Sequence, residues 1–175
     1  MEYETIADLP REKLIELTTE YAKSWLAMDG VWFQAVENKR GMDEAVEMDV
    51  EAWKRFSVIE AKRLKAFLGL EDNSGIEGLK KALRFRIYSP INEEEIKVSG
   101  NVLTLRVLSC RAQDARKRKG MDPHPCKPVG LAEYSGFSKT IDSRFSMECL
   151  SCYPDITDPA CACVWRFTLE EMVPE

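Results

Sequence analysis

Hydrophobic residues in the first half of the chain recur at steps of three and four, which is the spacing of an amphipathic helix. Asp8 and Pro10 are suited to begin a helix, and Gly41 is suited to end it. The pair Asp29-Gly30 falls inside this stretch and could kink or divide the helix. The one-faced stripe that predicts this helix consists of Leu14, Leu17, Tyr21, Trp25, Met28 and Trp32.

The same spacing predicts two further helices before Pro90. The second runs from about Asp43 to Leu68 and ends at Gly69, and the third follows Asn73-Ser74. We expect the tryptophans to lie in the core, although Trp25 and Trp32 could instead wall an apolar ligand pocket. The inward-facing residues that we expect are Met48, Ala52, Phe56, Ile59 and Phe67, with Trp53 beside them, and then Ile76, Leu79 and Leu83.

In the second half the hydrophobic period changes from 3.6 to 2, which is typical of β-strands. Ile96 and Val98 alternate with charged residues, Gly100-Asn101 is a hairpin signal, and the next strand leads to Cys110. A short basic helix over 111–119 and a helix over about 128–139 should follow. Two more alternating stretches, 145–149 and 163–169, predict a third and a fourth strand.

This order of elements predicts an α+β fold, with N-terminal helices packed on one face of a small antiparallel sheet of about four strands. A length of 175 residues suits a single domain over 1–175. Within it we expect a helical half at 1–90 and a half at 91–175 that holds the sheet and the cysteines.

Composition excludes several classes of function. The net charge of −5 argues against a nucleic-acid binder, whose affinity depends on neutralising phosphates. No apolar run approaches the roughly 18 residues of a membrane span, and the acidic start MEYETIADLP does not predict a signal peptide. We therefore expect a cytoplasmic protein, where cysteines are more often metal-binding or catalytic than disulfide-bonded.

The six cysteines are the main chemical signal. Cys149-x-x-Cys152 is a spacing that aims two sulfurs at one cation. Cys161 and Cys163 share a strand face but lie roughly 6.6 Å apart along it, so we expect only Cys163 to bind. Strand direction should bring all these sulfurs to one end of the sheet. The sequence thus predicts a zinc or iron–sulfur site formed by Cys126, Cys149, Cys152 and Cys163, with Cys110 or His124 as alternative ligands.

Two other interpretations of the cysteines remain open: a dithiol or disulfide pair, and inert core residues. A catalytic interpretation also stands. His124 is the only histidine, and it lies two residues before Cys126. A thiolate at Cys126 or Cys152 could therefore use His124 or Asp155 as its base.

In the catalytic interpretation, Arg116 or Arg144 would bind the anionic group of a ligand or cofactor. Each of these residues has a structural alternative. Asp155 follows a proline and could simply form a turn, His124 could face water, and the two arginines could form surface ion pairs.

Six segments together resemble a family of small proteins of unknown function from anaerobic bacteria and archaea. They are DGVWF, CRAQDARKRKG, PCKPVG, IDSRF, CLSCYPD and CVWRF. The resemblance carries over Cys110, Cys126, Cys149, Cys152, Asp155, Cys163 and Trp165, and it leaves out Cys161. The C-terminal part is also distantly similar to the L-2-amino-thiazoline-4-carboxylic acid hydrolase family, which would imply thiol-dependent hydrolysis.

The sequence therefore supports three functions, in this order. The first is a metal-binding cytosolic protein, the second is a thiol-dependent hydrolase, and the third is a sensor domain that binds a small molecule. We expect neither a nucleic acid nor a membrane as partner, and a homodimer is left open.

Overall fold

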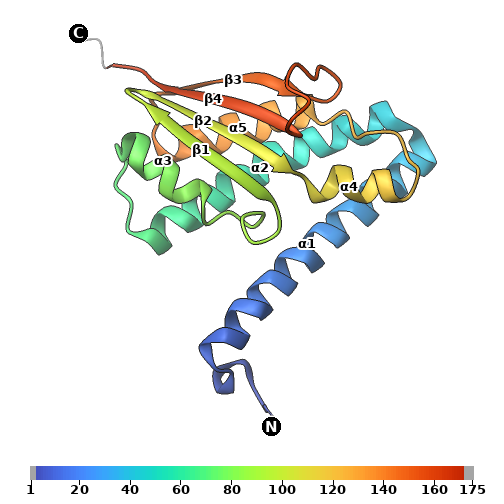
Figure 1. Ribbon diagram of the computed structural model, residues 1–175, viewed down its shortest axis with the longest axis horizontal. Helices are drawn as coiled ribbons and strands as arrows, with labels where there is room; N and C mark the ends of the chain where they lie inside the picture. The colour runs from blue at the N-terminus through green and yellow to red at the C-terminus, as the bar shows by residue number, and fades with distance from the viewer. Residues whose placement is uncertain (1–2, 172–175) are drawn as a thin grey trace.

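The computed structural model describes residues 3–171 and shows helices packed on a four-stranded antiparallel sheet (Figure 1). The predicted α+β class is confirmed. The elements in chain order are η1 (Ile6–Asp8), α1 (Arg11–Arg40), α2 (Met42–Leu68), α3 (Gly75–Leu83), β1 (Glu93–Ser99), β2 (Val102–Ser109), α4 (Arg111–Arg118), α5 (Lys127–Ile141), β3 (Phe145–Cys152) and β4 (Cys163–Leu169).

The sheet has the strand order β1-β2-β4-β3. β2 and β3 both pair with β4 in antiparallel fashion, so they run in the same direction. Helix α5 packs against β3, and α2 packs against α5, so that within residues 3–171 the helices lie on one face of the sheet (Figure 1). The core lies between the helices and the inner face of the sheet, around Leu105, Phe137, Phe145, Trp165 and Phe167.

The helix ends and the hairpin turn lie at the glycines from which they were predicted. Gly41 ends α1, and Gly69 ends α2 in the left-handed conformation that glycine adopts at least cost. Gly100, which has a φ of 59°, turns the β1–β2 hairpin. In α3, Leu79 and Leu83 are buried as predicted. No helix within residues 3–171 has the length and apolar character needed to cross a bilayer.

The apolar stripe that predicted α1 is largely exposed, although the helix itself spans the predicted region. Tyr21 and Met28 are more than half exposed, whereas Ala22 and Phe33 are buried. The reason is geometric, because the N-terminal half of α1 extends away from the rest of the protein (Figure 1). Trp32 is also exposed and so was misassigned to the core. The helix itself is continuous through Asp29-Gly30.

The buried face of α2 also differs from the prediction. Met48, Ile59 and Phe67 are exposed. The helix instead buries a stripe at steps of mostly four residues: Ala45, Asp49, Trp53, Ser57, Glu60 and Ala61. Small and polar residues occupy this face because α2 approaches α5 closely and supplies partners to buried charges. A Cβ added at Gly136 would lie 2.5 Å from Ser57 Oγ, and Glu60 binds the buried Arg86.

Candidate functional site

The cysteines gather at one end of the sheet because of strand direction. β2 ends there and is followed by Cys110, β3 ends there at Cys152, and β4 begins there at Cys163. Cys152 and Cys163 are directly opposite each other on neighbouring strands. Trp165 lies two residues beyond Cys163 on the same inner face and is fully buried. Cysteines from three separate strand ends therefore line one cavity beneath the helices.

A bulge in β3 sets the direction of Cys149. Residues three apart on a regular strand point to opposite faces. The register shifts between Cys149 and Ser151, which inserts one extra residue at Leu150. Cys149 therefore pairs with Trp165 and shares the inner face with Cys152. In this C-x-x-C segment a bulged strand, and not a tight turn, places both cysteines on the same face.

Cys126 reaches the cluster from the loop that precedes α5. Its sulfur lies 3.4 Å from the sulfur of Cys152, and both residues are free thiols. The backbone holds them together, because Lys127 N donates a hydrogen bond of 2.9 Å to the carbonyl of Tyr153. Cys126 also occupies the N-cap position of α5, where the helix dipole favours negative charge.

Gln113, His124 and Asp49 lie around Cys126, and of these three residues only His124 was predicted from the sequence. Gln113 Nε2 lies 3.4 Å from Cys126 Sγ and also donates to the His124 carbonyl at 2.8 Å. Gln113 Oε1 accepts from the His124 amide at 3.0 Å, so this side chain clamps the loop. The imidazole Nε2 of His124 is buried without a hydrogen-bond partner among residues 3–171 and lies 3.9 Å from Asp49 Oδ2.

These groups line a cavity of about 120 Å³ enclosed by α1, α2, α4, α5 and the sheet. It adjoins a second cavity of about 280 Å³, with which it shares Asp29, Asp49 and His124. The outer cavity also has basic residues on its wall, including Arg111 and Arg118. A small molecule could therefore enter past cations and reach thiols and carboxyl groups.

The surroundings of the cavity's carboxyl groups favour their protonated forms. Burial raises the pKa of Asp29 to about 6, and burial together with the charge of Asp29 raises the pKa of Asp49 to about 7. Neither carboxyl group forms an ion pair with a Lys or Arg side chain within residues 3–171. Asp49 therefore changes its charge near neutral pH, beside the histidine.

The surroundings of Cys110, Cys126, Cys149 and Cys152 disfavour ionisation of their thiols. Cys152 and burial raise the pKa of Cys126 well above its ordinary value, while the hydrogen bond and charge of His124 lower it. The hydrogen bond with Cys126 lowers the pKa of Cys152, but Cys163 and burial together raise it further, so the net shift is upward. Burial raises the pKa of Cys110 and that of Cys149. An ionised thiol at this site therefore needs a base or a cation.

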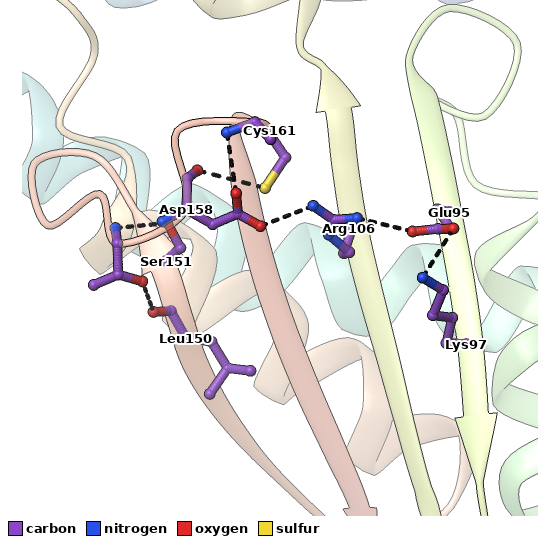
Figure 2. Close-up of polar contacts among 9 residues, drawn as sticks. Glu95, Lys97, Arg106, Leu150, Ser151, Asp158 and Cys161 are labelled. Carbon is purple, nitrogen blue, oxygen red and sulfur yellow. Dashed lines mark hydrogen bonds and ion pairs between the residues drawn. The ribbon is translucent and has the colours of Figure 1, made fainter.

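The loop that carries Cys161 is anchored on the opposite face of the sheet (Figure 2). Ser151 Oγ accepts hydrogen bonds from the amides of Thr157 and Asp158, and Arg106 binds the Asp158 carboxylate at 2.8 Å. Cys161 Sγ lies 3.7 Å from the Asp158 carbonyl. Cys161 does not line the inner cavity, and these contacts hold the middle of the loop that joins Cys152 to Cys163.

Four residues that we assigned to a site do not line the inner cavity: Cys149, Asp155, Arg144 and Arg116. Asp155 is exposed and forms an ion pair with Lys127 at 2.7 Å. Arg144 binds Asp142 where β3 begins, which is the end of the sheet far from Cys152. Arg116 lines the outer cavity, but its guanidinium already binds both carboxylate oxygens of Glu37. A ligand-binding role for these arginines stays a prediction.

The predicted metal ligands do not form a metal-binding arrangement within residues 3–171. Within residues 3–171, no three Cys, His, Asp or Glu side chains are placed so that they could hold a metal ion. The pair nearest to such an arrangement is Cys126 and Cys152, at 3.4 Å. A tetrahedral zinc ion with Zn–S bonds of about 2.3 Å separates its sulfurs by about 3.8 Å.

The sequence interpretation missed Asp29, Asp49 and Gln113. Asp49 did carry a signal, because it lies four residues before Trp53 and four after Ala45, so it shares their buried face. A carboxyl group on a buried helix face is uncommon unless it is paired or functional. Gln113 had no such signal, since its role depends on the path of a loop.

The fold and this site together define an α+β protein with a buried cavity lined by thiols, carboxyl groups and one histidine. The chain belongs to a family of unknown function, DUF6125, whose profile matches residues 7–169. A search of curated proteins found no match.

Proposed function

We propose that this protein is a thiol-dependent enzyme in which Cys126 attacks an electrophilic carbon of a small molecule, as in hydrolysis or acyl transfer. The observation that carries the proposal is the grouping of Cys126, His124, Asp49 and Gln113 around one buried cavity. A nucleophile, a base and a group that orients the base are the parts that this chemistry requires.

Each residue has a role that follows from its contacts. His124 lowers the pKa of Cys126 and would take its proton during the attack. Asp49 would stabilise the imidazolium that forms, because a nearby carboxylate favours the charged ring. Gln113 presents its amide N–H beside Cys126 Sγ, where a negative atom would develop on the substrate. Water would then release the acyl group from the sulfur.

The neutral state of Cys126 makes the base essential. A thiol whose pKa is raised supplies little thiolate at pH 7, so attack depends on proton transfer to His124. The low exposure of the His124 and Asp49 side chains also strengthens the interaction between the imidazolium and Asp49.

The test uses 4-nitrophenyl acetate as a generic acyl donor and the full-length chain. We expect Cys126→Ala to lower hydrolysis by on the order of 10²-fold or more, and His124→Asn by about 10²-fold. An acetyl group should be found on Cys126 by mass spectrometry after rapid quenching. Cys161→Ala is the matched control and should behave as wild type, because Cys161 lies outside the cavity.

Hydrolysis that is unchanged in Cys126→Ala would contradict the proposal. Cys152→Ala distinguishes between Cys126 and Cys152, the two thiols that the sequence offered as nucleophile. Because Cys152 raises the pKa of Cys126, its removal should leave hydrolysis intact or make it faster. If Cys152→Ala loses activity and Cys126→Ala retains it, the roles of the two thiols must be exchanged.

A second candidate function is binding of zinc or an iron–sulfur cluster by Cys126, Cys152 and Cys163, with Cys149 and Cys110 next to them. The separation of 3.4 Å between Cys126 Sγ and Cys152 Sγ favours it, because small shifts would bring both to one ion. A cation would also ionise the neutral thiols and release their protons.

Metal analysis of freshly purified protein separates the two candidates. One equivalent of zinc that is lost in Cys152→Ala, or a brown colour with iron, would support the metal site. Metal-free protein that neither binds added zinc nor releases protons would eliminate it. A zinc ion held by Cys126 would also block its acetylation, so the two outcomes are distinguishable in one preparation.

A further inference from the structure

Two sulfurs of the cluster lie almost within bonding distance. Cys126 Sγ and Cys152 Sγ are 3.4 Å apart, and a disulfide bond is about 2.05 Å long. The two sulfurs are thus about 1.4 Å further apart than in a disulfide, and this is the distance that side-chain rotation would have to close. The backbone supports this approach, since Lys127 and Tyr153, the residues that follow the two cysteines, are joined by a hydrogen bond.

A third sulfur connects this pair to the surface. Cys149 is on the same inner face as Cys152 because of the bulge at Leu150, and each of the two residues influences the pKa of the other. Cys152 is buried, whereas Cys126 and Cys149 are partly exposed, and of these three residues Cys149 is the one that does not line the inner cavity. The sulfurs of Cys126, Cys152 and Cys149 therefore form a row that leads from the cavity to solvent.

We propose that Cys126 and Cys152 form a reversible disulfide, and that Cys149 transfers it to the accessible Cys149–Cys152 position, where it is reduced. This would be a redox activity separate from acyl transfer. It does not depend on the proposed function, although oxidation would also block Cys126 as a nucleophile.

The oxidant is a hydroperoxide that enters the cavity. Cys126 attacks the peroxide oxygen, the O–O bond breaks, and the products are the sulfenic acid of Cys126 and one molecule of alcohol or water. Cys152 then attacks the sulfenic sulfur and releases water as the S–S bond forms. Two thiols have lost two electrons and two protons, and the peroxide has gained them.

The transfer to Cys149 changes no oxidation state. The Cys149 thiolate attacks the Cys152 sulfur, a new S–S bond forms, and Cys126 leaves as a thiolate that takes up the proton that Cys149 gave up. An external thiol then reduces the Cys149–Cys152 bond in two exchange steps. That reaction consumes two thiols and restores both cysteines.

The experiment treats reduced full-length protein with hydrogen peroxide, blocks free thiols with iodoacetamide and maps cross-linked peptides by mass spectrometry. We expect the Cys126–Cys152 peptide first and the Cys149–Cys152 peptide later. Titratable thiols should fall from six to four, since one disulfide removes two. Cys161→Ala is the matched control and should give the same cross-links as wild type.

Two variants test the order of the steps. Cys152→Ala should form no disulfide and should retain the sulfenic acid of Cys126, which dimedone traps. Cys149→Ala should accumulate Cys126–Cys152 and be reduced by glutathione more slowly, by on the order of tenfold, because the accessible position is lost. Both variants replace small buried or half-buried side chains, and a circular dichroism spectrum checks that each one folds.

The proposal is overturned if Cys126 and Cys152 remain thiols while Cys161 oxidises, or if the first cross-link joins other cysteines. It is also overturned if Cys149→Ala is reduced as fast as wild type, which would remove the transfer step. Failure of 4-nitrophenyl acetate hydrolysis would leave these results unaffected, so the two proposals can fail separately.

Discussion

Ionisable groups on the two sides of the sheet differ in whether they have an oppositely charged partner. On the outer face, Arg106 lies between Glu95 and Asp158, with distances of 3.0 and 2.8 Å (Figure 2), and Arg166 binds the cross-strand Glu148. These charges neutralise one another in pairs, at a surface where water also solvates them.

On the inner face, by contrast, acidic groups share one cavity whose lining, among residues 3–171, includes no Lys or Arg. Asp29, Asp49 and the thiol of Cys126 all have raised pKa values there. Arg86, a buried cation beneath the sheet, is already bound to Glu60 and Glu133. Asp29 and Asp49 have no Lys or Arg partner among residues 3–171, unlike Glu133, which lines the same cavity and binds Arg86. This difference marks the two aspartates as the groups where protons move.

The largest expected effect comes from breaking the buried ion triad. Arg86 is nearly fully buried, and its replacement by Met leaves Glu60 and Glu133 without their partner. We expect Arg86→Met to lower the free energy of unfolding by about 3–5 kcal/mol in urea titrations. Arg166→Met on the outer face is the control, and its cost should be below about 1 kcal/mol. Equal costs for the two variants would contradict the contrast between the faces.

A smaller effect concerns pH. The pKa of Asp49 is about 7 in the folded protein and near 3.9 in the unfolded chain, so the folded state binds the extra proton between these values. Its contribution to stability is therefore present at low pH and is lost as pH rises from about 4 to about 7.

Asp49→Asn should remove this loss. Between pH 4 and pH 8, the free energy of unfolding of wild type should fall by on the order of 2–4 kcal/mol more than that of the variant, measured by urea unfolding at each pH. Glu47→Gln, an exposed position on the same helix, should follow wild type. If wild type and Asp49→Asn have parallel pH profiles, Asp49 does not have a raised pKa.

The smallest expected effect comes from packing next to the cysteines. A Cβ at Gly130 would lie 2.5 Å from the Trp165 ring, so Gly130→Ala must push α5 away from β4. We expect a cost of roughly 1–3 kcal/mol in the free energy of unfolding. Gly30→Ala on α1 meets nothing closer than 3.9 Å and should instead stabilise the helix, by about 0.5–1 kcal/mol. Stabilisation by Gly130→Ala would show that the helix and sheet are not in close contact there.

Features that depend on neighbouring residues could be predicted from the sequence, and those that depend on tertiary packing could not. Gly41, Gly69 and Gly100 act within a few residues, so element boundaries followed from them. The gathering of Cys110, Cys152 and Cys163 at one end of the sheet followed from strand direction. The exposed stripe of α1 was not predictable, because periodicity shows that a face is apolar but does not show whether anything covers it.

The site was predicted in part for the same reason. Cys126 and His124 are close in sequence, so their proximity was foreseeable. Asp49 comes from a helix far along the chain, and Gln113 acts through a loop that it clamps. Their contribution depends on packing between α2, α4 and the sheet, which no local pattern encodes.

The central claim is that His124 controls the ionisation of Cys126. It is tested most directly by the rate of iodoacetamide alkylation at each cysteine, resolved by mass spectrometry across pH 5–10, in wild type and His124→Asn. Because His124 lowers the pKa of Cys126, alkylation of Cys126 should rise at a higher pH in the variant, while the profile of Cys161 stays unchanged. Identical Cys126 profiles in the two proteins would contradict the account.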